Sequence, residues 1–346
     1  MLRNRLFILS GLILGIIFLL AASAAAQFEP ASPPIADPAD RRFAGVHEDW
    51  STPALTTSNL RPVPPLIAPS NEEATCTVDL VQLQWRWGDP IDVYVIKPKG
   101  VKKPPVVLYL YGYPAETAIF RNEKYQEAVT KGGFAAVGFV SALTGHRYHD
   151  RPLREWFLSE LQESLAVSAH DVQEVLDYLA TRNDLDMSRV GMFTNGSAAT
   201  IGILASAVDP RIKVLDALDP WGDWPIWMAS STFVPDEERA SYLKPEFLKK
   251  ASAVEPLDWL PKMQAKKFRL QQTAYDTITP NAAKEKLRAA APAGTTAVVY
   301  KTSQEYASAM VGSVQLEWIE HALLSLPGAA SDGTTGTHNS APARSQ

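Results

Sequence analysis

Short continuous runs of apolar residues alternate along the chain with longer segments in which apolar and polar residues mix. Runs such as PVVLYLY at residues 105–111 are typical of strands that are buried on both faces. A short turn through Gly88 and Asp89 joins the first two predicted strands, so the sheet should begin with an antiparallel pair. We predict strands over residues 78–85, 91–97, 105–111, 134–141, 189–193, 212–218, 267–273 and 296–302.

The segments between these strands carry apolar residues at helical spacing. Because strands and helices alternate, we expect an α/β domain over residues 72–326, with a mostly parallel twisted sheet and helices on both faces. The predicted helices cover residues 122–130, 160–181, 197–208, 281–291 and 308–325.

The N-terminal residues have the pattern of a secretory signal peptide, which we predict over residues 1–26. Arg3 and Arg5 precede an apolar run, and Ala24 and Ala26 follow in an A-x-A arrangement. An uncleaved membrane anchor is the alternative, because residues 6–26 nearly reach the length that spans a bilayer. We therefore expect an exported protein, periplasmic or extracellular, that contacts the membrane only if this segment is retained.

Two further segments lie outside the predicted domain. Residues 27–71 are rich in proline and alanine, which predicts a linker or an extended arm. Residues 327–346 are small and polar, which predicts a disordered tail.

The charge of the chain excludes one class of partner. The net charge is −5, the pI is about 5.8, and no basic run follows the first few residues, so we expect no nucleic acid partner. Cleavage after residue 26 would remove Arg3 and Arg5 and bring the net charge to −7. Cys76 is the single cysteine, so no intramolecular disulfide can form.

We predict no metal and no cofactor. His146, His149 and Asp150 follow one another in the order H-x-x-H-D, but this stretch lacks the helical spacing of established zinc motifs. A solvated loop with ion pairs is the interpretation that we favour.

Three stretches together resemble one family. PPVVLYLYGYP resembles a strand that ends in an HG oxyanion motif, with Tyr111 in place of the histidine and Gly112 after it. DLDMSRVGMFTNGSAATIGILASAVDPRIK resembles a strand, a nucleophile elbow and a helix, and LQQTAYDTITP resembles the turn that presents a triad acid, here Asp276. The stretches resemble the α/β-hydrolase superfamily, in its exported esterase, dienelactone-hydrolase and prolyl-oligopeptidase-like branch, over residues 78–325.

The resemblance implies hydrolysis of an ester or amide through an acyl-enzyme, but two of the three triad positions are replaced. The elbow pattern places Thr194 and Ala198 at its small positions and Gly196 at the nucleophile. The loop after the last strand, where the family has its histidine, carries Glu305, and His321 comes only later, in the predicted terminal helix.

A shifted elbow is the alternative. It would use Ser197 as nucleophile, Asp276 as the acid and either Glu305 or a mobile histidine as the base. Tyr111, Gly112 and Ser197 would surround the oxyanion. A carboxylate of ordinary pKa is a weak base toward serine, so such an enzyme should be slow. Asp276 also has a purely structural interpretation, in which it caps the following helix or pairs with a lysine.

A tryptophan-rich stretch follows the predicted strand 212–218. Trp221, Trp224 and Trp227 are spaced three apart and fall near one helical face. They belong to residues 220–265, which we predict to form a small lid. The tryptophans either pack this lid onto the core or form an aromatic wall for an aryl or sugar group. Our leading hypothesis is a catalytically degenerate hydrolase that binds a small ester, aryl or sugar ligand or a partner. The alternatives are an active serine hydrolase that uses Ser197, and an envelope scaffold protein that uses its proline-rich arm.

Overall fold

The computed structural model describes residues 51–53, 63–86, 89–112, 117–142, 158–310 and 314–326. The chain divides into Met1–Asp40 and Arg41–Gln346, and all described residues belong to the second unit. The predicted signal peptide, most of the predicted arm, the predicted tail and the stretch with His146, His149 and Asp150 lie outside the described residues. Among the described helices, none has the length and apolar character needed to cross a membrane.

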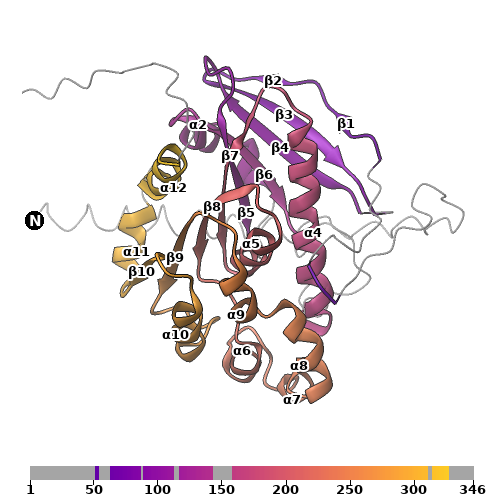
Figure 1. The fold of residues 1–346 in the computed structure, drawn as a ribbon, viewed down its shortest axis with the longest axis vertical. Coiled ribbons are helices and arrows are strands. Elements are labelled where there is room, and N and C mark those ends of the chain that lie inside the picture. Colours follow the sequence, from indigo (N-terminus) through magenta and orange to yellow (C-terminus); the bar gives the residue numbers. More distant parts are fainter. Residues whose placement is uncertain are drawn as a thin grey trace, which may run out of the picture. The chain divides into compact units, whose positions relative to one another are not determined.

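A ten-stranded sheet forms the centre of the described residues, with the order β1-β3-β4-β6-β5-β7-β8-β9-β10 and with β2 paired to β3 (Figure 1). From β6 to β10 all neighbours are parallel, whereas β3, β4 and β6 pair antiparallel, which confirms the predicted fold class. The main strands are β3 (Cys76–Leu83), β4 (Ile91–Pro98), β5 (Pro105–Tyr111), β6 (Ala135–Val140), β7 (Asp186–Asn195), β8 (Ile212–Leu218), β9 (Lys267–Thr273) and β10 (Thr296–Tyr300).

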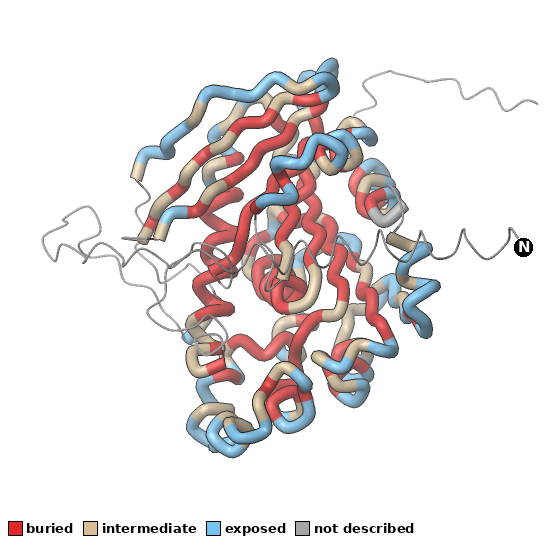
Figure 2. The backbone as a smooth tube through the Cα atoms, turned by 180° about the vertical axis from the view of Figure 1, so that it is seen from behind, coloured by how far each residue is buried: buried red, intermediate tan, exposed pale blue. Residues whose placement is uncertain are grey.

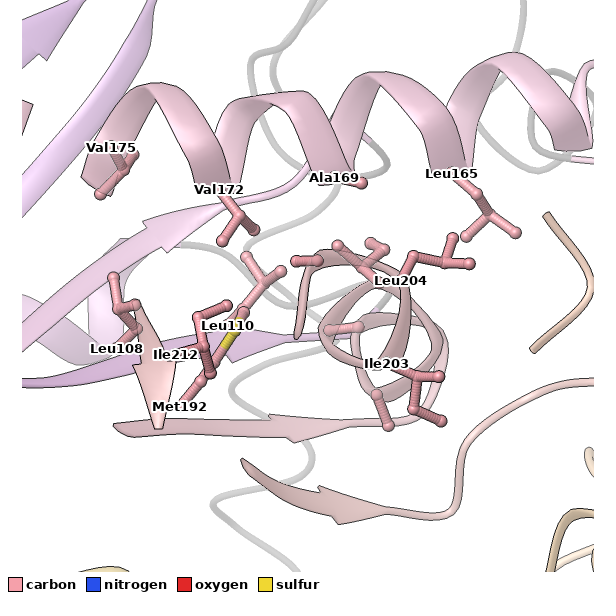
Figure 3. Packing of buried hydrophobic residues seen from close by; sticks show 14 of the residues in the cluster. Leu108, Leu110, Leu165, Ala169, Val172, Val175, Met192, Ile203, Leu204 and Ile212 are labelled. Carbon is pink, nitrogen blue, oxygen red and sulfur yellow. The ribbon is translucent and has the colours of Figure 1, made fainter. Parts of the chain in front are cut away.

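Both faces of the sheet are covered, because alternate residues of each central strand point to opposite sides. Val106, Leu108 and Leu110 of β5 belong to a core shared with α4 (Leu161–Ala180) and α5 (Ser197–Val208). Figure 3 shows Leu108, Leu110 and Met192 facing Leu204 of α5 and Val172 of α4.

The intervening residues of β5 face the other side. Val107 and Tyr109 pack in a second core with Val129 of α2 (Glu123–Thr130) and Ile319 of α12 (Val314–Leu324). Figure 2 shows the resulting distribution, with buried residues along the central strands and exposed residues on the outer helices.

Two elements differ from the predicted pattern. In the region of the predicted helix 308–325 the structure describes α11 (Ser303–Met310) and α12 (Val314–Leu324), so the helical region starts at Ser303, before the predicted residue. At the other end, β1 (Leu66–Ile67) and β2 (Asn71–Glu72) pair with β3, so the end of the predicted arm forms an edge of the sheet. The two short strands cover backbone groups at the edge of β3, and next to β1 the N–H of Ala68 donates to Leu80 O at 3.0 Å.

The segment between β8 and β9, predicted as a lid, consists of short helices. Contacts link α8 to α4, α9 to α5 and α6 to α10, so the segment packs beside the helical layers. Its helices are α6 (Trp224–Ser230), α7 (Arg239–Tyr242), α8 (Pro245–Ala251), η5 (Ser252–Val254), α9 (Pro256–Trp259) and η6 (Leu260–Lys262), and α10 (Asn281–Ala290) follows β9.

An ion-pair network ties the end of α4 to the antiparallel strands. Arg182 donates to Asp79 of β3 at 2.7 Å and to both oxygens of Asp184, at 2.8 and 2.7 Å. Lys97 of β4 pairs with Asp184 from the other side. The hydrogen bonds from Arg182 hold the pKa of the Asp184 carboxyl well below its usual value, although partial burial opposes them.

We expect the substitution Asp184→Asn to lower the free energy of unfolding by about 1 kcal/mol at pH 7, because it removes a paired charge that is partly exposed. The lowered pKa means that the ionised form stabilises the fold above the unfolded value of 3.8 and that this contribution disappears as the pH falls through the folded pKa. Urea unfolding at several pH values should therefore show a difference from the wild type that shrinks below about pH 4. The exposed Asp258→Asn is the control, and a difference that grows toward acid pH would contradict the assignment.

Candidate active-site pocket

A pocket of about 510 Å³ opens at the carboxyl ends of the central parallel strands, where folds of this class place their sites. Gly112 follows β5, Gly196 follows β7 and Asp219 follows β8 along its wall. Asp276, in the turn after β9, and Tyr306 of α11 also line the pocket.

Gly196 forms the bend between β7 and α5. Its backbone has φ 57° and ψ −128°, a combination that a residue with a Cβ atom adopts only under strain. Its N–H donates to Leu218 O at 2.9 Å and its carbonyl accepts from Ala199 N at 3.0 Å, so both strand and helix hold the bend. A Cβ atom at this position would lie 3.7 Å from Trp221 Nε1, an ordinary van der Waals distance, so the pocket has room for a side chain there.

Gly112 approaches this bend closely. A Cβ atom at position 112 would lie 2.5 Å from Asn195 O and 3.1 Å from Ser197 N, which only glycine avoids. The Gly112 N–H donates to Asn195 Oδ1 at 2.8 Å. The structure therefore brings the predicted oxyanion residues Gly112 and Ser197 together.

Tyr111, the third predicted oxyanion residue, lies elsewhere. Its hydroxyl is 2.9 Å from that of Tyr125, and its ring contacts those of Phe120 and Phe193. Burial raises the pKa of Tyr111 to about 12, so the phenol stays protonated. The side chain contributes to the core on the α2 face.

Ser197 begins α5 and is completely buried. Its Oγ would lie 3.1 Å from a Cβ atom at Gly112, so the hydroxyl faces the end of β5. It is not among the described residues that line the pocket.

Asp276 lines the pocket, and its carboxylate is engaged by the turn in which it stands. Oδ1 accepts from Ile278 N at 3.0 Å, Oδ2 accepts from Thr279 N at 3.1 Å, and Lys284 Nζ lies 3.6 Å from Oδ2. These are the contacts of the structural interpretation, in which the residue caps the turn before α10 and pairs with a lysine.

Lys284 of α10 is buried below this turn. Its ammonium group donates to Thr273 O and to Asp276 O, both at 2.7 Å. It thereby fixes the two ends of the turn that follows β9.

Comparison with known proteins assigns the fold. No family model matches the chain, and no curated protein matches it. The solved acetyl xylan esterase from Paenibacillus sp. R4 superposes with a TM-score of 0.60 at 16% identity, over 79% of this chain and 90% of that one. Acetyl xylan esterase 1 from Thermoanaerobacterium sp. JW/SL YS485 gives 0.58 at 13% identity, over 75% and 87%. An S-formylglutathione hydrolase from Agrobacterium tumefaciens gives 0.53 at 15% identity, over 74% and 99%.

The chain has the α/β-hydrolase fold. In this fold the residue at a sharp bend between strand and helix carries the nucleophile, and the bend of this chain is at Gly196.

Glu305 does not occupy a pocket loop, which corrects the expectation for that position. It lies in the first turn of α11 and is exposed, with Oε2 accepting from Lys301 N at 2.7 Å. Its N–H donates to Thr302 Oγ1 at 3.2 Å, because the order T-S-Q-E forms the start of a helix. The next residue, Tyr306, lines the pocket instead.

The tryptophans divide between the pocket and the core. Trp221 lines the pocket and stacks on Trp227 with 5.2 Å between ring centroids, and Trp224 meets Trp227 edge-on at 5.8 Å. Trp224 and Trp227 are almost fully buried in the core and do not line the described pocket, so the predicted aromatic wall reduces to Trp221.

Asp219 is a pocket residue that the sequence did not single out. It follows β8 in a left-handed conformation with φ 48°, and its two oxygens accept from Thr273 N and Thr273 Oγ1, both at 2.7 Å. Burial raises the pKa of Asp219 to about 6, against the opposing hydrogen bonds from Thr273. Asp219 directly follows the predicted strand 212–218, and this position at the carboxyl end of a parallel strand is the sequence feature that indicates a site residue.

We expect Lys284→Met to lower the free energy of unfolding by about 2 kcal/mol, because the carbonyl oxygens of Thr273 and Asp276 lose their shared buried donor. Urea denaturation would measure the change. Lys249→Met, on the exposed end of α8, removes the same charge and should stay within about 0.5 kcal/mol of the wild type. Equal effects of the two substitutions would contradict the role of Lys284.

Proposed function

We propose that this chain is a catalytically degenerate protein of the α/β-hydrolase fold that binds a small ligand in the pocket beside Gly196. The observation that carries the proposal is the bend itself. Gly196 has the backbone conformation of an elbow apex and lies beside the pocket, but it has no side chain and so supplies no nucleophilic oxygen or sulfur atom.

The surroundings of the bend support the proposal. The Glu305 carboxylate is exposed and accepts a hydrogen bond from Lys301 N at the start of α11, so it does not serve as a base in the pocket. The histidines within the described ranges are His170, buried in α4, and His321 of α12, and neither lines the pocket. A nucleophilic hydroxyl requires a base within hydrogen-bond reach.

The rival function is an active serine hydrolase that uses Ser197. It requires the Ser197 hydroxyl to meet a substrate in the pocket, whereas the side chain is fully buried and faces Gly112. One backbone donor expected for the oxyanion, Gly112 N–H, is already bonded to Asn195 Oδ1.

A fluorophosphonate probe separates these two functions, because it reacts only with an activated nucleophile. We expect no labelling of the wild-type protein. The double variant Gly196→Ser with Tyr306→His should become labelled, since both positions line the same pocket and the bend already has room for a side chain. Intact-mass spectrometry after incubation would measure the adduct.

Ser197→Ala is the matched control, because it removes a hydroxyl from the same turn without touching the bend. Labelling of the wild type that disappears in Ser197→Ala would contradict the proposal and establish the serine hydrolase. Near-ultraviolet circular dichroism would verify that each variant keeps the wild-type fold.

We also propose that the protein is exported and acts in the periplasm or outside the cell. The basic, apolar and small-residue order of residues 1–26 supports export. Expressed in a Gram-negative host, the chain should be recovered from the periplasmic fraction with Gln27 as its first residue, as measured by N-terminal sequencing. Recovery of a membrane-bound chain that starts at Met1 would instead favour the anchor.

A further inference from the structure

The described wall of the ligand pocket combines two carboxylates with three aromatic rings. Asp219 and Asp276 stand at the ends of β8 and β9, and Trp221, Tyr275 and Tyr306 supply the rings. Among the described lining residues there is no lysine, arginine or histidine. The positive group nearest to these carboxylates that the structure describes is Lys284, which lies behind the wall and 3.6 Å from Asp276 Oδ2.

The carboxylates and the rings face a common space. Burial raises the pKa of Tyr275 and of Tyr306, and the charge of Asp219 acts in the same direction on both. These two carboxylates and two phenol rings line the same pocket of about 510 Å³. Tyr300 holds Tyr306 in place through an edge-to-face contact with 5.7 Å between ring centroids.

Asp219 retains capacity for a ligand. Each of its oxygens accepts one hydrogen bond from Thr273, and a carboxylate has about four acceptor positions. Asp276 contributes less, because Lys284 lies 3.6 Å from its Oδ2 and partly neutralises it from below the turn. Lys284 itself is directed to two backbone carbonyls and does not line the pocket.

We propose that the pocket binds an organic cation, a ligand with an ammonium group, with Asp219 as its main counter-ion and the rings of Trp221, Tyr275 and Tyr306 around it. This inference rests on the proposed ligand-binding function and names the class of ligand. A cation gains from carboxylates by Coulomb attraction and from aromatic faces by cation–π interaction, and a neutral ester or sugar gains from neither. Trp221 lines the pocket beside Gly196.

Three probes of nearly equal shape test the charge of the ligand. Choline carries a trimethylammonium group, 3,3-dimethylbutan-1-ol is its neutral carbon analogue, and 3,3-dimethylbutanoate is an anion of similar size. Each is titrated into the full-length protein at pH 7.5 and low salt, where charge interactions are least screened, and binding is followed by NMR. We expect choline to bind at least about tenfold more tightly than the alcohol, and the anion to bind most weakly.

Two variants locate the preference. Asp219→Asn keeps an acceptor for Thr273 and a residue type that tolerates the left-handed conformation, and it should reduce the preference for choline about tenfold. Tyr275→Leu tests the rings at a position that is 44% exposed, so the fold should not depend on it, and it should weaken choline binding severalfold. Asp258→Asn is exposed and distant in sequence from the pocket, and it should bind choline like the wild type.

The pH dependence adds a readout that does not require a mutation. Asp219, with its pKa raised to about 6, should be mostly protonated at pH 5, so the affinity for choline should fall about tenfold between pH 7.5 and pH 5. The same change should be nearly absent in Asp219→Asn. The groups that act on Asp219 from neighbouring elements are Thr273, Tyr275, Asp276, Lys284, Tyr300 and Tyr306.

The inference is overturned if the alcohol or the anion binds as tightly as choline, if none of the three binds, or if the preference survives in both Asp219→Asn and Tyr275→Leu. Binding of the alcohol or the anion would leave the ligand-binding proposal intact while excluding the cation. Fluorophosphonate labelling of the wild type would overturn catalytic degeneracy and leave the charge preference measurable, so the two failures are distinguishable.

Discussion

The backbone bend at Gly196 is the constraint on which the rest of the site depends. One residue, with φ 57° and ψ −128°, turns the chain from β7 into α5 and so sets the helix against the sheet. The same turn brings Ser197 and Asn195 against Gly112 and places position 196 next to Trp221. It also serves the core, because α5 lies between α4 and the strands (Figure 3). The bend is thus needed for folding whether or not the apex carries a nucleophile.

Hydrogen bonds from neighbouring residues hold the two pocket carboxylates, Asp219 and Asp276, in place. Thr273 supplies both hydrogen bonds to Asp219, and the turn after β9 supplies those to Asp276. Lys284 secures this turn from below by binding two of its carbonyls. In a hydrolase an acid at such a position orients a histidine. On the proposed function the carboxylates instead stabilise the turn and give the pocket its negative charge.

The apolar runs predicted most of the fold, and the parts they missed depend on contacts between distant residues. β5, β8, β9 and α5 have the predicted bounds, since uninterrupted apolar runs and helical spacing are local signals. The pairing of β1 with β3 joins residues about 15 positions apart, and the side chain of Asp219, whose backbone is left-handed, is held by Thr273 of the neighbouring strand β9. The sequence T-S-Q-E at residues 302–305 is a helix-capping pattern and is a local signal for the start of α11. The prediction of a loop here did not use this signal, and it therefore placed Glu305 in the site instead of in a helix. For Gly196 the sequence pattern and the observed bend coincide at the same residue.

The energetics of the bend favour glycine once catalysis is no longer required. A residue with a side chain held at this φ and ψ stores about 1–3 kcal/mol of strain, which an active enzyme tolerates because the geometry is part of its mechanism. Glycine removes that strain and loses about 0.5–1 kcal/mol through the greater freedom of the unfolded chain. The first effect is the larger, so on the proposed function a single change at position 196 would abolish the nucleophile and stabilise the fold together. The pocket would survive such a change, because the carboxylates and rings of its wall belong to other strands and turns.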